Sequence, residues 1–375
     1  MKGILTELNQ YKGEQVEIIP WSVPYIDSRE KNLVNQAIDS TWLSMGPLVN
    51  QFELELAEIT GAKFCVATSN GTTALHLGYL ALGLKIGDKI AIPAYGFMAA
   101  ANIAIQMGLD ILFYDVDPET MNVLHSELER LSKTKLVAFV VIQNYGNMNN
   151  MSLIEEWAAE NGVLLIEDAA ESLGSSFGDR KSGNFGAIST MSFHGAKTIT
   201  TGEGGAVFTN DQEIYEILKL YRSHGVRKEP YKHELPGHNF RMSNLQGALG
   251  VAQVEKLSEV LQRKKSIQDQ YSKLLAGSNW NLPVVIPSAK VIFWAIPVWQ
   301  QDSNKRPLND VINSLNAKGI ETRNGFYSAN RLDIYHAQQI FPNANKFSEE
   351  CIILPSYFHL KQEQIAYICQ SLLEM

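Results

Sequence analysis

The sequence predicts an α/β protein in which a mostly parallel sheet, covered by helices on both faces, is followed by a smaller C-terminal α/β domain. Its 375 residues suit one large domain and a smaller partner. Hydrophobic residues make up 45% of the chain and charged residues 19%, so there is ample material for a packed core. From residue 68 onward, apolar strand-like runs alternate with amphipathic helix-like runs, which is typical of parallel sheets.

The alternating elements follow one another through the first half of the chain. Strand-like apolar runs are expected at residues 87–94, 110–117, 136–143 and 163–170. Helices are expected at residues 74–84, 99–107 and 153–161, with a further one before Lys135. Ligands of such sheets bind at the carboxyl ends of the strands. The segments of interest are therefore residues 69–73, 94–97, 143–146, 168–171 and 192–197.

The pattern changes after about Gly250. A long, charge-rich helix is expected over residues 254–274, followed by a mixed region and a terminal helix from Gln362. We predict a large domain over residues 1–250 and a small domain over residues 251–375. A long helix that bridges both parts would blur this boundary.

Charge and cysteine usage exclude several classes of partner. The net charge of −8 and a pI near 5.6 disfavour nucleic acid, which needs a basic face. Cys65, Cys351 and Cys369 have neither paired nor metal-like spacing, so we expect a reducing compartment and no metal site. No signal peptide or membrane-length apolar run is evident. We expect a cytoplasmic protein that does not associate with membranes.

The segment SFHGAKTITTGEGG at residues 192–205 carries the most chemical information. Lys197 stands between a strand ending at Ser192 and a glycine-rich return from Gly202, where the backbone can turn tightly. A lysine fixed in this way can form a Schiff base with an aldehyde cofactor. A surface lysine beside a glycine loop fits the local string equally well, so other segments must decide.

Two strand ends add a carboxylate and an anion site. Asp168 ends an apolar strand, where burial of a carboxylate requires a cationic partner; the protonated pyridine nitrogen of pyridoxal phosphate is one such partner. Residues 69–73, SNGTT, lead into a helix whose N-terminus can bind phosphate. Phe97 follows another strand and could stack on a flat ring. Helix capping and core packing are the alternative explanations for these residues.

Taken together, the strings SNGTTALHL, PAYGF, IEDAAES, SFHGAKTITTGEGGAVFTND and NFRMSNLQGALG resemble the DegT/StrS family of sugar aminotransferases. The likeness runs from about Pro24 to the carboxyl end. It implies the fold-type I, aspartate aminotransferase-like architecture, with a seven-stranded sheet in the large domain. It also implies pyridoxal phosphate as cofactor, alternating with pyridoxamine phosphate.

The resemblance gives the matching positions roles. Lys197 matches the Schiff-base lysine, Asp168 the partner of the pyridine nitrogen and Phe97 the stacking aromatic. The expected phosphate and phenolic-oxygen contacts are Gly71, Thr72, Ser192 and Glu171. Asn239 matches an asparagine that reaches the phosphate from the neighbouring subunit, which implies a homodimer with shared sites.

The strings STWLSMGP, ETRNGFY and ILPS are most similar to members that aminate the 4-position of 4-keto-6-deoxy sugars carried by a nucleotide. We expect L-glutamate as donor, a dTDP-linked sugar as first choice of acceptor and a GDP-linked one as second. The product would serve a surface polysaccharide such as the O-antigen of lipopolysaccharide. The candidate substrate contacts are His194, Arg222, Arg227, Lys228, Arg241 and Arg323, although surface ion pairs would explain each arginine equally well.

Two departures from the family pattern bear on the substrate. Gln143-Asn144 stands where His-Leu is common, and Asn324-Gly325 stands where Pro-Val is more usual. We expect both to lie near the sugar pocket. A 3-keto aminotransferase and a sugar dehydratase remain alternatives, although the dehydratase branch has histidine where this chain has Lys197. A non-catalytic regulator would need neither Lys197 nor Asp168.

Overall fold

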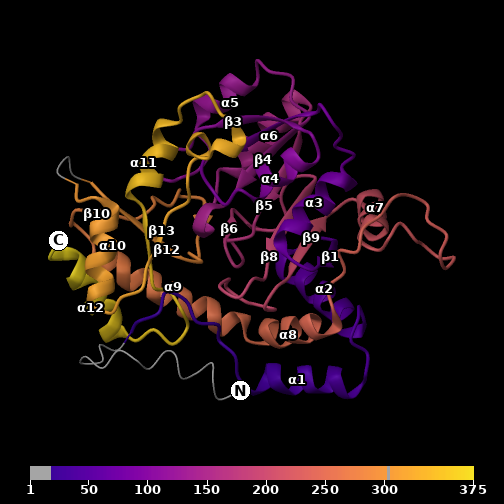
Figure 1. Cartoon of the computed structure of the whole chain (residues 1–375), viewed down its shortest axis with the longest axis horizontal. Coiled ribbons are helices and arrows are strands. Elements are labelled where there is room, and N and C mark those ends of the chain that lie inside the picture. The colour runs from indigo at the N-terminus through magenta and orange to yellow at the C-terminus, as the bar shows by residue number, and fades with distance from the viewer. Residues whose placement is uncertain (1–17, 302–304) are drawn as a thin grey trace.

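The computed structural model describes residues 18–301 and 305–375, and a seven-stranded sheet lies at its centre (Figure 1). Neighbouring strands from β8 to β3 are parallel, whereas β9 runs antiparallel between β1 and β8. The predicted mostly parallel sheet of seven strands is therefore confirmed. In spatial order, the strands are β1 (Phe64–Thr68), β9 (Gly205–Thr209), β8 (Ile188–Ser192), β5 (Leu164–Asp168), β4 (Ala138–Ile142), β2 (Lys89–Pro93) and β3 (Asp110–Tyr114).

Helices cover both faces of this sheet because its strands are apolar on both sides. Val66 of β1 and Val207 of β9 belong to one hydrophobic core, while the adjacent Ala67 and Phe208 belong to a second. Successive side chains of a strand point to opposite faces, so the two cores lie on opposite faces. The helices packed around the sheet include α2 (Pro47–Thr60), α3 (Gly71–Ala81), α4 (Ala99–Gln106), α5 (His125–Leu131), α6 (Met151–Asn161) and α7 (Gln212–Arg222).

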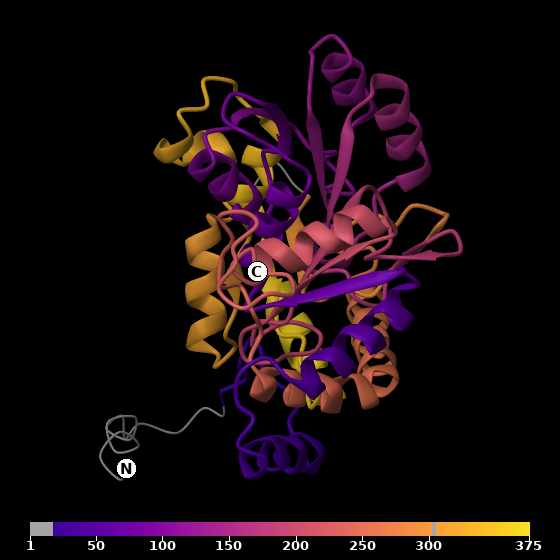
Figure 2. The same ribbon diagram turned by 90° about the vertical axis from the view of Figure 1, so that its right-hand side faces the viewer.

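The C-terminal part contains a four-stranded antiparallel sheet with α10 (Leu308–Ala317), α11 (Pro342–Glu350) and α12 (Gln362–Leu373) (Figure 2). Its strands, in spatial order, are β10 (Trp280–Asn281), β12 (Ile296–Gln300), β14 (Ile352–Leu354) and β13 (Arg323–Asn324). A third, three-stranded sheet consists of β11 (Ala289–Lys290), β6 (Ser176–Phe177) and β7 (Arg180–Lys181). Because β11 pairs with β6, this small sheet connects the C-terminal part to the first.

Two helices run end to end beneath both parts in Figure 1, α8 (Asn244–Glu255) and α9 (Leu257–Leu274). Helix α8 passes through residue 250, so the domain boundary that we predict there falls inside a helix. The division into two domains at this residue stays a prediction. Within residues 18–301 and 305–375, no helix combines the length and the apolar character that crossing a membrane requires.

A buried ion pair attaches the N-terminal segment to the junction of α8 and α9. Glu30 lies in α1 (Ser28–Asp39), and Lys256 Nζ lies 2.5 Å from its Oε1 atom. The same amine donates to the Tyr25 carbonyl at 2.8 Å. The two side chains are 0% and 1% exposed, so the charge of Glu30 depends on Lys256 for compensation.

We expect Lys256→Met to lower the free energy of unfolding by about 3–5 kcal/mol, because it leaves Glu30 charged and buried without its cation. The exposed pair of Lys265 and Asp269 provides a matched control: Lys265→Met should cost less than about 1 kcal/mol. Urea denaturation followed by circular dichroism measures both changes. Equal losses in the two variants would contradict the role of the buried pair.

Candidate active site

The predicted strand-end residues gather at one edge of the seven-stranded sheet. Asp168 is the last residue of β5, and Ser192 is the last residue of β8. The turn at Ser69 follows β1, which has the same direction as β8 because both pair antiparallel with β9. Residues from distant parts of the sequence therefore meet there, as expected for parallel strands.

Backbone hydrogen bonds close the loop that carries Lys197. Phe193 N–H donates to the Gly204 carbonyl at 2.8 Å, and Thr201 N–H donates to the Phe193 carbonyl at 2.9 Å. The return begins at Gly202, whose φ of +80° is the left-handed conformation that glycine adopts without strain. The loop thus fixes the backbone of Lys197, as the sequence predicts.

The amine of Lys197 has two neighbours. Its Nζ atom lies 3.0 Å from Glu171 Oε1 and 3.8 Å from the centre of the Trp294 ring. The side chains of Lys197 and Glu171 are 14% and 4% exposed, so the ion pair is largely shielded from water. A carboxylate and an aromatic face both stabilise the charged form of an amine.

The peptide of Tyr145 holds both of these neighbours. Its N–H donates to Glu171 Oε2 at 2.8 Å, and its carbonyl accepts the N–H of Trp294 at 2.9 Å. Tyr145 lies in the 3₁₀ turn η2 (Asn144–Gly146) with φ of 56°, a conformation that costs a bulky residue about 1–3 kcal/mol. The site therefore contains backbone strain at the residue that aligns the partners of Lys197.

Asp168 is a buried carboxylate whose closest hydrogen-bond donor is a backbone amide. The Ala170 N–H donates to its Oδ1 atom at 3.1 Å. Burial raises the pKa of Asp168 from its ordinary value of 3.8 to about 7, although this bond and the charge of Lys197 oppose the shift. A cation placed against Asp168 would favour its ionised form.

A candidate anion site lies at the N-terminus of α3. Asn70 caps this helix by accepting the N–H of Thr73 at 2.9 Å, which leaves the N–H groups of Gly71 and Thr72 beyond the helical hydrogen bonds. A side-chain carbon at Gly71 would lie 2.8 Å from Ser192 Cβ, so only glycine allows this close approach. The two amides and the Ser192 hydroxyl can together bind a phosphate.

Phe97 and Asn239 are both open to solvent. The Phe97 side chain is 61% exposed, and its ring meets Phe326 edge-on at 6.1 Å, which leaves a face for a flat ring. Asn239 Oδ1 accepts Arg241 Nε at 3.0 Å. The adjoining Phe240 carbonyl accepts Ser69 N–H at 2.9 Å, so this segment borders the anion site of its own chain.

The basic residues that we expect to contact the substrate differ in their exposure and in their ion-pair partners. Arg222 is 4% exposed and its Nη1 atom binds Glu53 Oε1 at 2.5 Å, so this guanidinium neutralises a carboxylate beside β1 and is not placed to meet a diphosphate. Arg241 and His194 are exposed close to the loops of the site. Arg323 is exposed in β13 and pairs with Glu321 at 2.8 Å. Arg227 pairs with Glu216 and Glu234.

Some features of the site could not be read from the sequence. The strand-end rule highlights residues 143–146 but not the role of the Tyr145 peptide, and nothing local points to Trp294. Gln143 and Asn144, which we expect near the sugar pocket, are buried. Gln143 Nε2 donates to Glu167 at 3.0 Å, and Asn144 Nδ2 donates to the Tyr95 carbonyl at 3.2 Å. This departure from the family pattern therefore serves internal packing.

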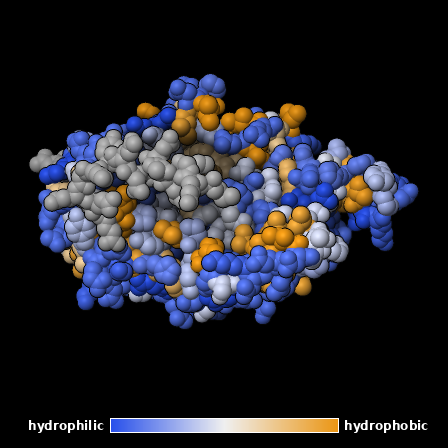
Figure 3. Space-filling model, turned by 60° about the horizontal axis from the view of Figure 1, so that its bottom comes forward, coloured by the Kyte–Doolittle hydropathy of each residue, from blue (hydrophilic) through white to orange (hydrophobic). Residues whose placement is uncertain are grey.

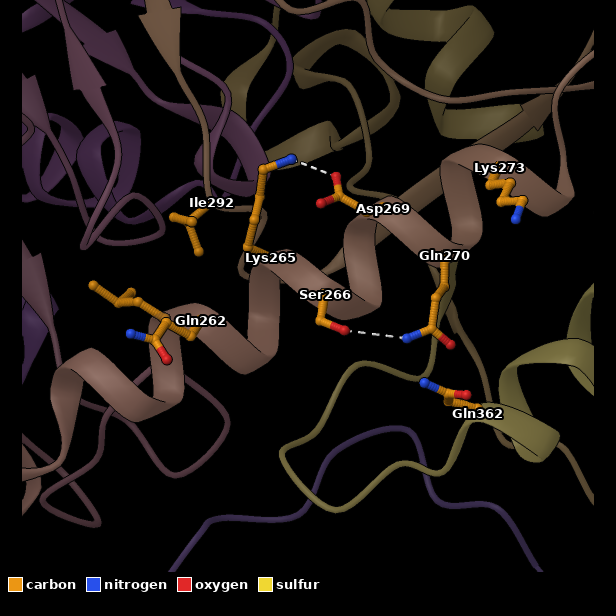
Figure 4. Close-up of a pocket in the computed structure, with 9 residues that line it drawn as sticks. Gln262, Lys265, Ser266, Asp269, Gln270, Lys273, Ile292 and Gln362 are labelled. Atoms are coloured by element: carbon orange, nitrogen blue, oxygen red, sulfur yellow. Dashed lines mark hydrogen bonds and ion pairs between the residues drawn. The ribbon is translucent and has the colours of Figure 1, made fainter.

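A separate groove of about 730 Å³ lies along the outer face of α9. In Figure 4 its polar side chains bind one another, with Lys265 paired to Asp269 and Gln270 donating to Ser266 at 3.2 Å. Neither Lys197 nor Asp168 lines it. The groove is thus distinct from the strand-end site.

The sequence profile of the DegT/DnrJ/EryC1/StrS aminotransferase family matches residues 24–373. GDP-perosamine synthase of Escherichia coli O157:H7 is 36% identical over 365 residues, covering 96% of this chain and 99% of the relative. GDP-perosamine synthase of Vibrio cholerae is 33% identical, covering 94% of this chain and 97% of the relative.

Solved structures show the same likeness over nearly the whole chain. The Helicobacter pylori aminotransferase involved in the biosynthesis of pseudoaminic acid superposes with a TM-score of 0.90 at 26% identity, covering 96% of this chain and 99% of the other. The E. coli GDP-4-keto-6-deoxy-D-mannose-3-dehydratase with bound hydrated PLP gives 0.88 at 26% identity, covering 95% and 100%. The fold-type I architecture is thereby confirmed.

The residues of the strand-end site fit pyridoxal phosphate. Among the residues that the structure describes, no cation forms an ion pair with the buried carboxylate of Asp168, which suits a protonated pyridine nitrogen. The N-terminus of α3 with Ser192 suits the phosphate. Lys197 places a shielded amine at the same edge. These residues supply separate contacts for the three polar ends of one flat molecule.

We expect the stability of the cofactor-free protein to fall as pH rises from about 4 to about 7, because folded Asp168 retains a proton that the unfolded chain releases. Each pKa unit corresponds to about 1.4 kcal/mol. The loss of folding stability due to Asp168 therefore reaches a few kcal/mol near neutral pH. Asp168→Asn removes it and should flatten the profile of unfolding free energy against pH. Parallel profiles for wild type and variant, measured by urea denaturation, would contradict the burial effect.

Proposed function

This chain belongs to the DegT/DnrJ/EryC1/StrS aminotransferase family and uses pyridoxal phosphate, and we propose that it moves the amino group of L-glutamate to a 4-keto-6-deoxy sugar linked to a nucleoside diphosphate. The observation that carries the proposal is the shielded amine of Lys197 beside Glu171, at the same strand edge as buried Asp168. A regulator without catalysis has no need for this combination.

The residues of the chain divide the work of the reaction. When bound, pyridoxal phosphate supplies a ring that accepts the electron pair released when the donor loses its α-proton. Asp168 keeps the ring nitrogen protonated. Gly71, Thr72 and Ser192 hold the phosphate, and Phe97 supports the ring. Lys197 Nζ would take the proton from the donor's α-carbon and pass it to the cofactor's aldehyde-derived carbon, while Glu171 orients that amine.

The proposed acceptor is a 4-keto sugar because the relatives of this chain include perosamine synthases. These proteins are named for a GDP-linked product, which favours GDP over the dTDP that the sequence strings alone put first. Arg241 and Arg323 are exposed guanidinium groups suited to a diphosphate, since their planar forks donate paired hydrogen bonds. Amination of a 3-keto sugar and dehydration of the sugar are the alternative outcomes of the test. We further propose that the product serves O-antigen synthesis.

We expect the purified enzyme to aminate GDP-4-keto-6-deoxymannose with glutamate faster than dTDP-4-keto-6-deoxyglucose or a 3-keto isomer, as judged by product mass. Lys197→Ala should abolish turnover, whereas Lys181→Ala, which changes an exposed lysine of β7, should not. Loss of the sugar 3-hydroxyl without gain of nitrogen would establish a dehydratase. A preference for the 3-keto isomer would overturn the positional assignment.

The chain is further proposed to act as a homodimer with shared sites. Exposed apolar side chains gather in α1, α2 and their connection, where Ile38, Trp42, Leu43 and Leu54 are 49–73% exposed. Figure 3 shows hydrophobic patches on the face of the molecule beneath the sheet. Such patches fit a partner surface. Asn239 is also exposed, as a residue that reaches into another subunit's site must be.

Subunit mixing provides the test. We expect Lys197→Ala and Asn239→Ala proteins, each nearly inactive alone, to regain activity when mixed, because hybrid dimers have one site without either lesion. Mixing Lys197→Ala with Arg180→Ala, which changes an exposed residue of β7, controls for dilution. Confirmed subunit exchange without a gain in activity would show that each site is built from one chain.

A further inference from the structure

The contacts of the Lys197 amine have a geometry that the proposed reaction alone does not require. Glu171 and Trp294 come from different parts of the fold, one just after β5 and the other just before β12. Both nevertheless meet at one Nζ atom, at 3.0 Å from the carboxylate and 3.8 Å from the ring centre. The Lys197 amine can occupy this position between Glu171 and Trp294 when it is not bonded to a cofactor.

We propose that Glu171 and Trp294 form a resting site that holds the amine of Lys197 whenever it is released from the cofactor. The proposal rests on the proposed function, because amino transfer requires this lysine to leave the cofactor and return in each half of the reaction. Trp294 thereby becomes a residue of the catalytic site that touches the reacting nitrogen. The resting site thus holds the released amine in one position close to the strand edge.

Two contacts hold the amine of Lys197 in the resting site. The carboxylate of Glu171 contributes a charge-assisted hydrogen bond, and the face of the Trp294 ring attracts a cation. The side chain of Trp294 is 8% exposed, so the contact is shielded from competing water.

Several tethers make the resting site rigid. The Tyr145 peptide binds Glu171 through its N–H and Trp294 through its carbonyl. The indole N–H donates to the Ala196 carbonyl at 2.6 Å, next to Lys197 itself. Lys264, which is 7% exposed, donates to the Trp294 carbonyl at 2.7 Å. Trp294 is therefore held by hydrogen bonds to its main chain and to its indole N–H. The face of its ring stays aligned with the Lys197 amine.

Trace acetylation of the cofactor-free protein tests the proposal independently of catalysis. Each lysine's rate with acetic anhydride is measured by peptide mass spectrometry, with Lys219 as internal reference. Glu171→Gln preserves side-chain size but removes the charge, so Lys197 should react about tenfold faster, as expected for loss of an interaction near 1.4 kcal/mol. Trp294→Leu should also accelerate it, and Trp294→Phe should do so less because an aromatic face remains.

Tyr215→Leu is the matched control, since it removes the aromatic face that lies 4.3 Å from Lys219 Nζ; Lys181, an exposed residue of β7, then serves as the reference. It should leave the rate of Lys197 unchanged. Unaltered Lys197 rates in folded Glu171→Gln and Trp294→Phe proteins would overturn the proposal. Acceleration in Trp294→Leu alone would also overturn it, because simple exposure would then explain the effect.

A second readout uses the loaded enzyme at a fixed ratio of glutamate to 2-oxoglutarate. The resting site stabilises the released lysine. Glu171→Gln and Trp294→Leu should therefore each shift the absorbance spectrum toward the lysine-bound form of the cofactor. An unshifted equilibrium would contradict the proposal. If glutamate failed to convert even the wild type, the proposed donor would be wrong, while the acetylation result would still decide whether the resting site exists.

Discussion

The ion pair between Lys197 and Glu171 is the interaction on which the rest of the site depends. A carboxylate that is 4% exposed needs a cation to offset its lost hydration, and Lys197 provides it. The pair fixes the position of the lysine amine beside Glu171. Its geometry in turn requires the left-handed Tyr145 peptide, so the fold accommodates local strain in order to align one carboxylate.

Three lysines of low exposure illustrate how surroundings decide function. Lys256 is paired with Glu30 and attaches the N-terminal segment to the helices below the sheet. Lys264 donates to backbone carbonyls, and burial lowers its pKa to about 7. Lys197 retains 14% exposure and lies where strands end. Burial alone therefore does not identify the reactive lysine; position at the carboxyl edge of the sheet does.

The sequence predicts what local pattern controls and misses what tertiary packing decides. Strand periodicity and strand-end rules locate Asp168 and Ser192 because parallel strands bring their carboxyl ends together. They cannot locate Trp294, which reaches the site from the loop just before β12. Arg222 is a substrate candidate by its charge and its position near Asn239 in sequence, because its partner Glu53 lies far away in sequence. Likewise, the roles of Gln143 and Asn144 depend on neighbours that only folding supplies.

The central claim is that Lys197 carries the cofactor in an aminotransferase site at this strand edge. Reduction of the purified enzyme with borohydride, followed by proteolysis and mass spectrometry, tests it most directly. The account predicts that the reduced cofactor will be recovered on the peptide that contains Lys197, and that prior incubation with glutamate will prevent this labelling. Recovery on another lysine, such as Lys181 or Lys264, would contradict the account.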